Sequence, residues 1–219
     1  MTDWLNKCHF GDCRQQMLAW PAGVADACIT DPPYGDTSLH WDKKVSGWIP
    51  VVARVLKPAA TIWVFGSMRY LAPLFAEMEE HGFKYSQDIV WEKQNGSGLL
   101  NDRFRRVHEH AVMFYRGAWS EIHYEAQHTH DGTAKTARRK SKPQHMGGNL
   151  RPNFYLSVDG GPRLQRSVIR VSNEHGKAYH PTQKPLPLME WCLGFLPDAK
   201  TILDPFMGSG TTLVACQRM

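Results

Sequence analysis

The 219-residue sequence lacks the features that mark several common protein classes. No apolar run approaches the roughly 18 residues of a membrane-spanning helix, and the opening stretch MTDWLNKCHFGD has no hydrophobic segment typical of a signal peptide. The five cysteines form no CxxC pair, the spacing of common zinc and redox motifs. We therefore expect reduced thiols, no membrane partner and a cytoplasmic location.

A metal site is also not expected, although the chain has eleven histidines. The histidines between positions 123 and 145 have no cysteine among them and match no common zinc spacing. The HEH segment at 108–110 lacks the HExxH spacing, so we interpret it as part of a strand.

Short apolar segments alternate with amphipathic ones along most of the chain, which indicates one α/β domain. With 42% hydrophobic and 21% charged residues, the chain can bury a core of ordinary size. The expected strands are 6–12, 26–33, 60–67, 84–93 and 109–117, and the expected helices are 13–20, 45–58 and 70–82. A helix beginning after Pro185 or Pro187 and a final strand, glycine-rich turn and helix complete the pattern.

The net charge of +5 is concentrated in one region. Ten basic residues and three acids lie between positions 130 and 177, where apolar periodicity is weak. A solvated loop would more often mix both signs, so we favour contact with a polyanion. We expect a basic lobe at 118–178 inserted between a catalytic half at 1–117 and a cofactor-binding part at 179–219.

The segment ITDPPYGD at 29–36 ends an apolar strand on a carboxylate followed by two prolines and a tyrosine. Proline fixes φ and removes a backbone donor, so Pro32 and Pro33 stop the strand ladder and hold a rigid turn. A polar strand end is one interpretation. The other is a preorganised site for a planar group, built from Asp31 and Tyr34.

The segment TILDPFMGSGTTLVA at 201–215 places Asp204 and three small residues between a strand and a helix. Glycines at such a turn let the backbone approach a ligand closely. No lysine follows GSG, and the third glycine of GxGxxG is absent, so neither phosphate-binding motif is present. A nucleoside-type cofactor such as S-adenosylmethionine remains. In a parallel sheet, Asp31 and this turn would open on the same edge.

These motifs resemble those of the β-class amino-methyltransferases of DNA, which use S-adenosylmethionine. The matching segments are TDPPYG (30–35), RVLKPAATIWVFGS (54–67), DIVWEK (88–93), RRVHEHAVMFYR (105–116), HPTQKP (180–185) and DPFMGSGTT (204–212). The resemblance implies a doubly wound, Rossmann-like methyltransferase sheet with an inserted recognition lobe. It also implies a bacterial or phage-encoded protein that acts at the nucleoid, within restriction-modification.

The resemblance implies a role for each residue of the DPPY motif. Asp31 and the Pro32 carbonyl would accept hydrogen bonds from the target amine, Pro33 would hold the turn, and Tyr34 would stack on a flipped base. Transfer would be a direct displacement without a covalent intermediate. A cytosine-C5 enzyme would need a nucleophilic cysteine, and Cys28 is expected to be buried in a strand.

The cofactor residues that the resemblance implies come from both ends of the chain. Asp12, in FGDC, would meet the adenine ring, although capping of the next helix is an equal alternative. The others are Asp31, His180, Thr182, Lys184, Pro185, Asp204, Pro205, Phe206, Gly208, Ser209, Gly210 and Thr211. The family usually continues into a strand whose acid holds the ribose, so we expect a truncated chain ending at Met219.

The expected partner is double-stranded DNA, contacted by basic residues of the lobe. These are Arg138, Arg139, Lys140, Lys142 and Arg151. In the family DPPY favours adenine N6 and SPPY cytosine N4, so adenine is the expected target and cytosine N4 the alternative. The sequence also leaves open methylation of RNA or of a protein amide, and a non-catalytic role in DNA binding. A homodimer and a cognate restriction nuclease are partners that the resemblance allows.

Overall fold

The computed structural model describes residues 4–97, 102, 104–122, 124–138, 154–174, 176 and 178–219, with only the backbone of residues 97, 138, 154 and 155. The chain divides into two units, 1–125 with 167–219, and 126–166. The second unit is shorter than the segment 118–178, because the strand at 168–170 pairs with the main sheet of the first unit.

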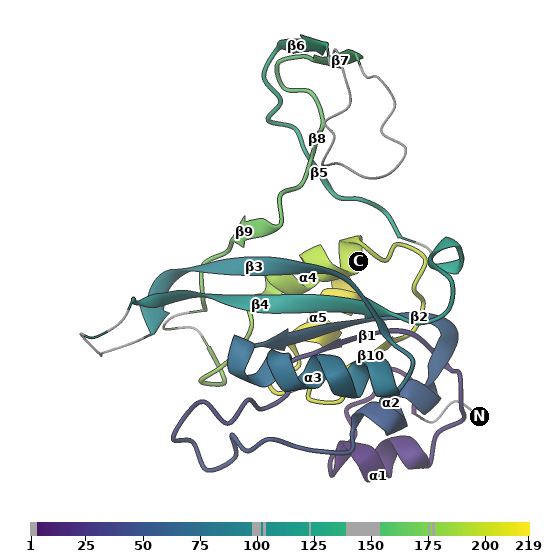
Figure 1. Ribbon diagram of the computed structural model, residues 1–219. Helices are drawn as coiled ribbons and strands as arrows, with labels where there is room; N and C mark the ends of the chain where they lie inside the picture. The colour runs from purple at the N-terminus through teal and green to yellow at the C-terminus, as the bar shows by residue number, and fades with distance from the viewer. Residues whose placement is uncertain are drawn as a thin grey trace. The chain divides into compact units, whose positions relative to one another are not determined.

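Helices and strands alternate through the first unit (Figure 1). In chain order they are α1 (Cys13–Leu18), β1 (Ala25–Thr30), α2 (Ile49–Val55), β2 (Leu56–Gly66), α3 (Met68–Glu80), β3 (Lys84–Ser97), β4 (Arg106–Tyr115), η1 (Trp119–Glu121), β9 (Val168–Arg170), α4 (Leu186–Gly194), β10 (Ile202–Leu203) and α5 (Thr211–Arg218). The second unit contains β5 (His128–Thr129), β6 (Lys135–Arg138), β7 (Phe154–Ser157) and β8 (Arg163–Leu164), paired as β5 with β8 and β6 with β7.

One six-stranded sheet forms the centre of the first unit, in the order β10-β1-β2-β4-β3-β9. β1 is parallel to β10 and β2, whereas β4 is antiparallel to both of its neighbours. β3 therefore runs parallel to β2. The carboxyl ends of β10, β1, β2 and β3 and the amino end of β4 consequently meet at one edge, called the site edge below.

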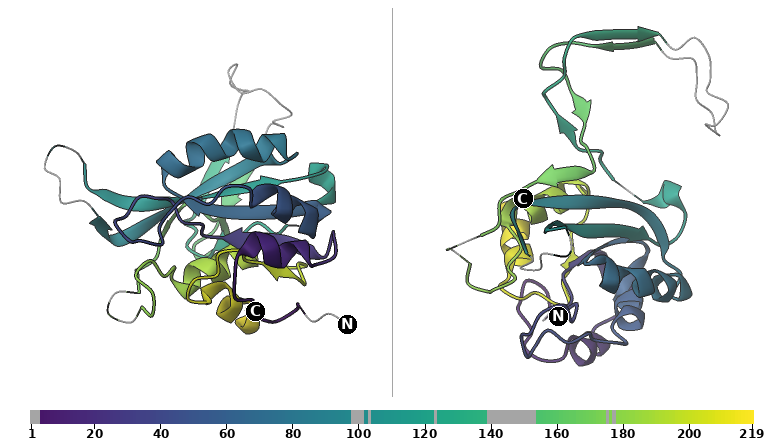
Figure 2. Two further views of the ribbon diagram at one scale, coloured as in Figure 1. Left: turned by 90° about the horizontal axis from the view of Figure 1, so that it is seen from below. Right: turned by 60° about the vertical axis from the view of Figure 1, so that its left-hand side comes forward.

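Both faces of this sheet are covered by helices, which confirms the expected doubly wound architecture (Figures 1 and 2). On β2, Ile62 and Val64 pack with residues of α2 and α3 on one face. Their neighbours Trp63 and Phe65 pack with α4 on the other face. Alternate strand side chains point to opposite faces, so an uninterrupted apolar strand supplies two cores at once.

The expected strand at 6–12 is wrong, because residues 7–10 have no regular structure. Phe10 is fully exposed, and Gly11 has φ +134°, so this segment buries no apolar face that would stabilise pairing. The other expected elements of the first unit are present with shifted ends. β2, for example, begins at Leu56, four residues before the expected strand.

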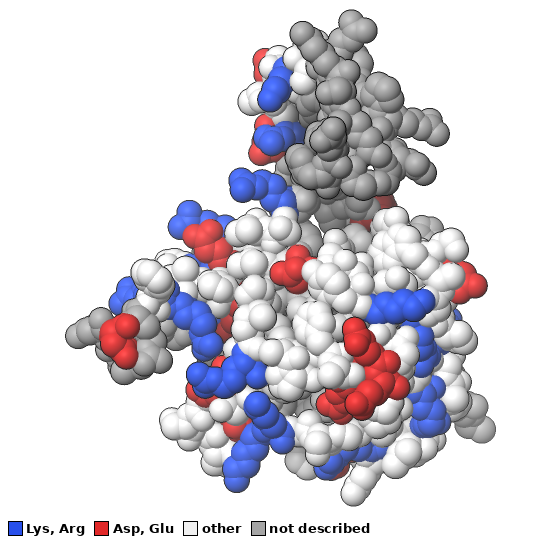
Figure 3. All heavy atoms as spheres, viewed as in Figure 1, with Lys and Arg blue, Asp and Glu red and all other residues white. Residues whose placement is uncertain are grey.

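The surface of the first unit carries both signs of charge on the face seen in Figure 3. Among the described residues, no helix is long and apolar enough to cross a membrane. All five cysteines are free thiols: Cys28 and Cys192 are buried, and Cys8 and Cys216 are exposed.

Candidate active site

A cavity of about 630 Å³ opens at the site edge of the sheet. Asp31 lies there because β1 ends at Thr30 and Asp31 is the single residue between the strand and the two prolines. Asp204 follows β10, the parallel neighbour of β1, and lines the same cavity. The expectation that these two motifs meet at one edge is confirmed.

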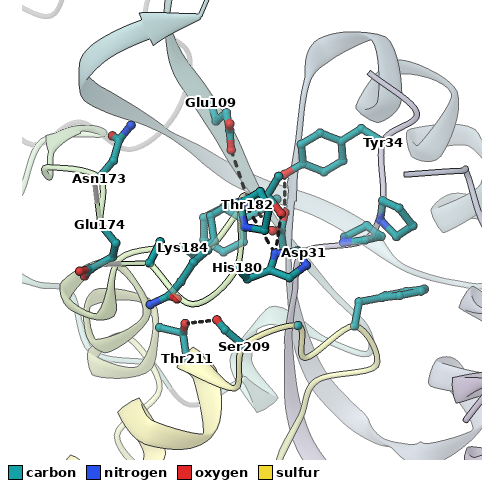
Figure 4. A pocket seen from close by; sticks show the side chains of 18 of the residues that line it. Asp31, Tyr34, Glu109, Asn173, Glu174, His180, Thr182, Lys184, Ser209 and Thr211 are labelled. Atoms are coloured by element: carbon teal, nitrogen blue, oxygen red, sulfur yellow. Dashed lines mark hydrogen bonds and ion pairs between the residues drawn. The ribbon is translucent and has the colours of Figure 1, made fainter. Parts of the chain in front are cut away.

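Asp31 is held through both carboxylate oxygens (Figure 4). The Tyr34 hydroxyl donates to Oδ1 at 2.5 Å, and the Lys184 ammonium donates to Oδ2 at 2.5 Å. The Asp31 side chain nevertheless remains 23% exposed, so a ligand in the cavity can reach it. The tyrosine ring packs against Tyr70, with ring centroids 5.5 Å apart.

The pKa of Asp31 is raised above its ordinary value by burial, although the ammonium of Lys184 partly offsets this effect. Burial alone would lower the pKa of Lys184, but the carboxylates of Asp31 and Glu109 outweigh it and raise that pKa. Lys184 is therefore a fixed cation, and Asp31 is an unusually basic carboxylate for its type.

Glu109 and Lys93 also belong to this cluster, although the sequence motifs assign them no role. The ammonium of Lys184 lies 3.4 Å from Oε2 of Glu109, and Lys93 donates to its Oε1. These two cations outweigh the effect of burial and lower the pKa of Glu109 to about 2. Glu109 is one residue before His110, which pairs with Gly66 at the end of β2, so the strand register places it at the site edge.

The glycine-rich turn after β10 is organised by Asp204. Its Oδ2 accepts from the Thr212 hydroxyl at 2.6 Å, and its Oδ1 accepts from the Phe206 amide at 3.1 Å. These bonds fasten the turn to the first turn of α5. Burial raises the pKa of Asp204 to about 6.

Gly210 precedes α5 with φ +80°, and Gly208 has φ +54°. This left-handed region is accessible to glycine without a steric penalty, so the turn depends on these residues. Ser209 and Thr211 lie at the floor of the cavity with their hydroxyls 3.1 Å apart (Figure 4).

A second cavity of about 930 Å³ is also lined by residues of this turn. Both cavities are lined by Asp204, Met207, Gly208 and Thr212. The second cavity also contains Gly11, Cys13 and Gln16 from the region of α1. The turn therefore borders both cavities.

Most residues of the predicted site line the first cavity, but four do not. The cavity is lined by Asp31, Pro32, Pro33, Tyr34, His180, Thr182, Lys184, Asp204, Phe206, Gly208, Ser209 and Thr211. Pro205 lines the second cavity, Pro185 is the N-cap of α4, and Gly210 is the N-cap of α5. Asp12 lines neither cavity.

The structure shows the capping role for Asp12. Its carboxylate accepts from the Arg14 amide at 2.9 Å at the start of α1. The Arg14 guanidinium pairs with the same carboxylate, and these hydrogen bonds lower its pKa to about 2. Contact of Asp12 with a cofactor stays a prediction.

The structure describes little of the segment that contains the residues predicted to contact DNA. Arg138 ends β6, and only its backbone is described. Arg139, Lys140, Lys142 and Arg151 lie outside the described residues. Within the described parts of the chain, no three His, Cys, Asp or Glu side chains are grouped so that they could hold a metal ion.

Asp42 fixes the loop that follows the DPPY motif. The buried carboxylate accepts from the amides of Gly35 and Thr37 at 2.9 and 2.8 Å. Asp42, which lies seven residues after Gly35, thereby fixes the backbone of the loop next to Tyr34. Only the tertiary fold reveals this contact, because Asp42 belongs to no motif.

A family comparison covers most of the chain. The family model for N6 and N4 methyltransferases, described as DNA methylase, matches residues 25–219. This range includes the first cavity with Asp31, Lys184 and the turn after β10.

Individual relatives have similar chains. The sequence is 29% identical to the type II methyltransferase M2.DpnII of Streptococcus pneumoniae over 78% of this chain and 57% of the relative. It is 26% identical to the type II methyltransferase M.HinfI of Haemophilus influenzae over 97% of this chain and 62% of the relative. The chain thus spans about three fifths of the length of these curated relatives.

A solved structure of M1.HpyAVI in complex with SAM superposes with a TM-score of 0.63. The two sequences are 27% identical, and the match covers 96% of this chain and 87% of that chain.

Proposed function

Since this chain belongs to the N6/N4 DNA methylase family, we propose that it transfers a methyl group from S-adenosylmethionine to the exocyclic amine of a base in double-stranded DNA. One observation carries the proposal: Asp31 and the glycine-rich turn after Asp204 line the same cavity. A group that binds the acceptor amine and a turn suited to the methyl donor are thereby brought together.

The two cavities share Asp204 and Gly208 in their lining, and each has the volume typical of a site for a small molecule such as S-adenosylmethionine. When bound, this cofactor supplies an electrophilic methyl group on a sulfonium. We infer that Phe206, Gly208 and Ser209 hold it across the turn. The solved complex of M1.HpyAVI with SAM supports this choice of cofactor.

Asp31 is suited to orient an amine. Its raised pKa makes it a strong hydrogen-bond acceptor, and the adjacent Pro32 offers a carbonyl that has no competing strand partner. Both acceptors would draw the N–H bonds of the amine to one side, which turns the nitrogen lone pair toward the methyl donor. Rate enhancement then comes from positioning and fixed charges.

The target amine lies inside a DNA duplex, so we infer that the base is flipped into the first cavity. The Tyr34 ring lines this cavity and supports stacking on the base. In the structure the tyrosine hydroxyl donates to Oδ1 of Asp31, the position that an incoming amine would also use. The amine would replace this donor.

Adenine N6 is our preferred target, with cytosine N4 as the alternative, because the motif begins with aspartate at position 31. Cytosine C5 is disfavoured, since Cys28 is fully buried in β1 and burial raises the pKa of its thiol well above the ordinary value.

Labelled methyl transfer tests the proposal. The purified protein should transfer methyl from S-adenosylmethionine to duplex DNA, and nucleoside mass spectrometry should detect N6-methyladenine. Asp31→Ala should lower turnover by about 100-fold or more while DNA binding is retained, because it removes the acceptor of the amine.

The matched control is Asp88→Ala, which removes a carboxylate that is 43% exposed on β3. It should leave turnover unchanged. Label on cytosine N4 would reverse the choice of base, and label on RNA or protein alone would contradict the proposed substrate. Retained turnover in Asp31→Ala would refute the assigned role of Asp31.

A further inference from the structure

Four charged side chains from four different segments form one continuous chain that lines the first cavity. In order they are Asp31 after β1, Lys184 before α4, Glu109 on β4 and Lys93 on β3. The charges alternate in sign and sum to zero, which is the arrangement that buried ion pairs require. Glu109 and Lys93 have no role in the proposed function as stated above.

Lys184 is the central member and is almost fully enclosed, with only 8% of its side chain exposed. Its ammonium lies 5.5 Å from the centroid of the Tyr34 ring and 5.7 Å from that of Phe65. Aromatic faces stabilise a cation without competing for its protons. The Lys184 ammonium donates a hydrogen bond to Asp31 at 2.5 Å and forms an ion pair with Oε2 of Glu109 at 3.4 Å, an oxygen that has no hydrogen-bond partner among the described residues.

The two oxygens of Asp31 differ in their contacts as a result. Lys184 occupies Oδ2, and the only described partner of Oδ1 is the tyrosine hydroxyl, which can rotate away. A mobile Lys184 would instead contact either oxygen and would compete with the amine for Oδ1. The ordered arrangement needs an anchor on the far side of the ammonium.

We propose that Glu109 is this anchor: a positioning residue that holds Lys184 on one oxygen of Asp31 and leaves the other oxygen to the target amine. Lys93 neutralises the second oxygen of Glu109, so that Glu109 does not draw Lys184 away from Asp31. This inference rests on the proposed function, because it assigns Oδ1 to the amine.

Lys184, Glu109 and Tyr34 act on the pKa of Asp31, and the charge of Asp31 in turn acts on Asp204 and Tyr70. The negative charge of Glu109 raises the pKa of Asp31. Glu109→Gln removes this charge, so the acid limb of the pH profile of kcat/KM should move to lower pH by about one unit. Turnover should fall about 10-fold, because Lys184 loses its anchor.

The KM for S-adenosylmethionine should stay within about twofold in Glu109→Gln, because Lys184 acts on Asp31 rather than on the cofactor. A large rise in this KM would overturn the proposal and assign Lys184 to the cofactor carboxylate. Glu109→Asp, which keeps the charge, should recover part of the turnover. Glu92→Gln on β3, a 41% exposed acid that faces Arg170, is the control and should change nothing.

Glu109→Gln alone is expected to destabilise the fold, because removal of one partner from a buried ion pair is strongly destabilising. A double variant therefore provides a second test. Glu109→Gln combined with Lys93→Met removes both charges and leaves no unpaired cation. It should show the same acid-limb shift. In a Lys184→Met background, Glu109→Gln should cause no further loss of turnover, and an additive loss would contradict action through Lys184.

An NMR titration of the Asp31 carboxyl carbon separates this inference from the proposed function. The midpoint should be lower in Glu109→Gln than in the native protein, whether or not the protein methylates DNA. An unchanged midpoint would overturn the inference alone. Absence of methyl transfer by a native protein that shows this shift would instead contradict the proposed function.

Discussion

At the scale of single residues, Asp31 and Glu109 show how one environment gives two carboxylates opposite properties. Both are close to Lys184. Asp31 has one neighbouring cation, Lys184. Its attraction does not compensate for the effect of burial, so the pKa of Asp31 is raised. Glu109 has a second cation in Lys93, and its pKa is lowered to about 2. The count of neighbouring cations therefore decides which acid is the better acceptor.

The raised pKa of Asp204 predicts a pH-dependent contribution to stability. The folded state keeps a proton on Asp204 up to a pH of about 6, whereas the ordinary value is 3.8. The folded state therefore binds more protons in this window, and stability falls as the pH rises through it. Relative to Asp204→Asn, the native protein should lose up to about 3 kcal/mol of unfolding free energy between about pH 4 and pH 7.

Urea unfolding at a series of pH values measures this difference. Asp88→Asn serves as the control for loss of an exposed carboxylate on β3. A native-minus-variant difference that stays constant with pH, or that grows as the pH rises, would show that burial does not raise the pKa of Asp204.

At the scale of elements, the site depends on strand direction. β1 and β10 deliver Asp31 and Asp204 at their carboxyl ends, and the antiparallel β4 delivers Glu109 near its amino end. The short α5 then begins at the turn that lines both cavities. A change in the backbone of this turn would alter both cavities.

Gly210→Ala tests the backbone requirement of this turn. A Cβ atom at this position would meet nothing within 4 Å, so the cost comes from the left-handed φ of +80° alone. We expect a loss of about 1–2 kcal/mol in the free energy of unfolding, measured with urea. Gly210→Asn should cost less, because asparagine tolerates this region better. Equal losses for the two variants would argue against conformational strain.

At the scale of the whole molecule, basic charge is concentrated in one stretch of the chain. On the face seen in Figure 3 the described first unit carries both signs of charge, whereas ten basic residues and three acids lie between 130 and 177. Such a bias is typical of a segment that contacts DNA phosphates, and we propose this role for it.

Neutralisation of Arg138, Arg139 and Lys140 to glutamine should weaken binding to duplex DNA and flatten its salt dependence. Each lost phosphate contact should reduce the slope of log K against log salt by about 1. The matched control replaces Lys57, Lys84 and Lys200, which lie at the starts of strands, away from the site edge. If the control and the test variant change the slope equally, the DNA surface lies elsewhere.

Much of the first unit was predictable because its signals are local. The apolar run at 60–66 becomes a central strand, and the prolines at 32 and 33 follow the end of β1, since periodicity and proline geometry act within a few residues. The segment at 6–12 was predicted wrongly as a strand, because pairing depends on a partner that local sequence does not supply.

The sequence by itself determined the order of the motifs and the expectation that two strand ends share an edge, and it predicted roles for Asp31 and Tyr34. Only the tertiary structure decided that Lys184, Glu109 and Lys93 join Asp31. These contacts link residues as far apart as 31 and 184, and the register of β3 and β4 places Lys93 and Glu109 among them. Register is set by packing of the whole sheet, so no short pattern could have revealed them.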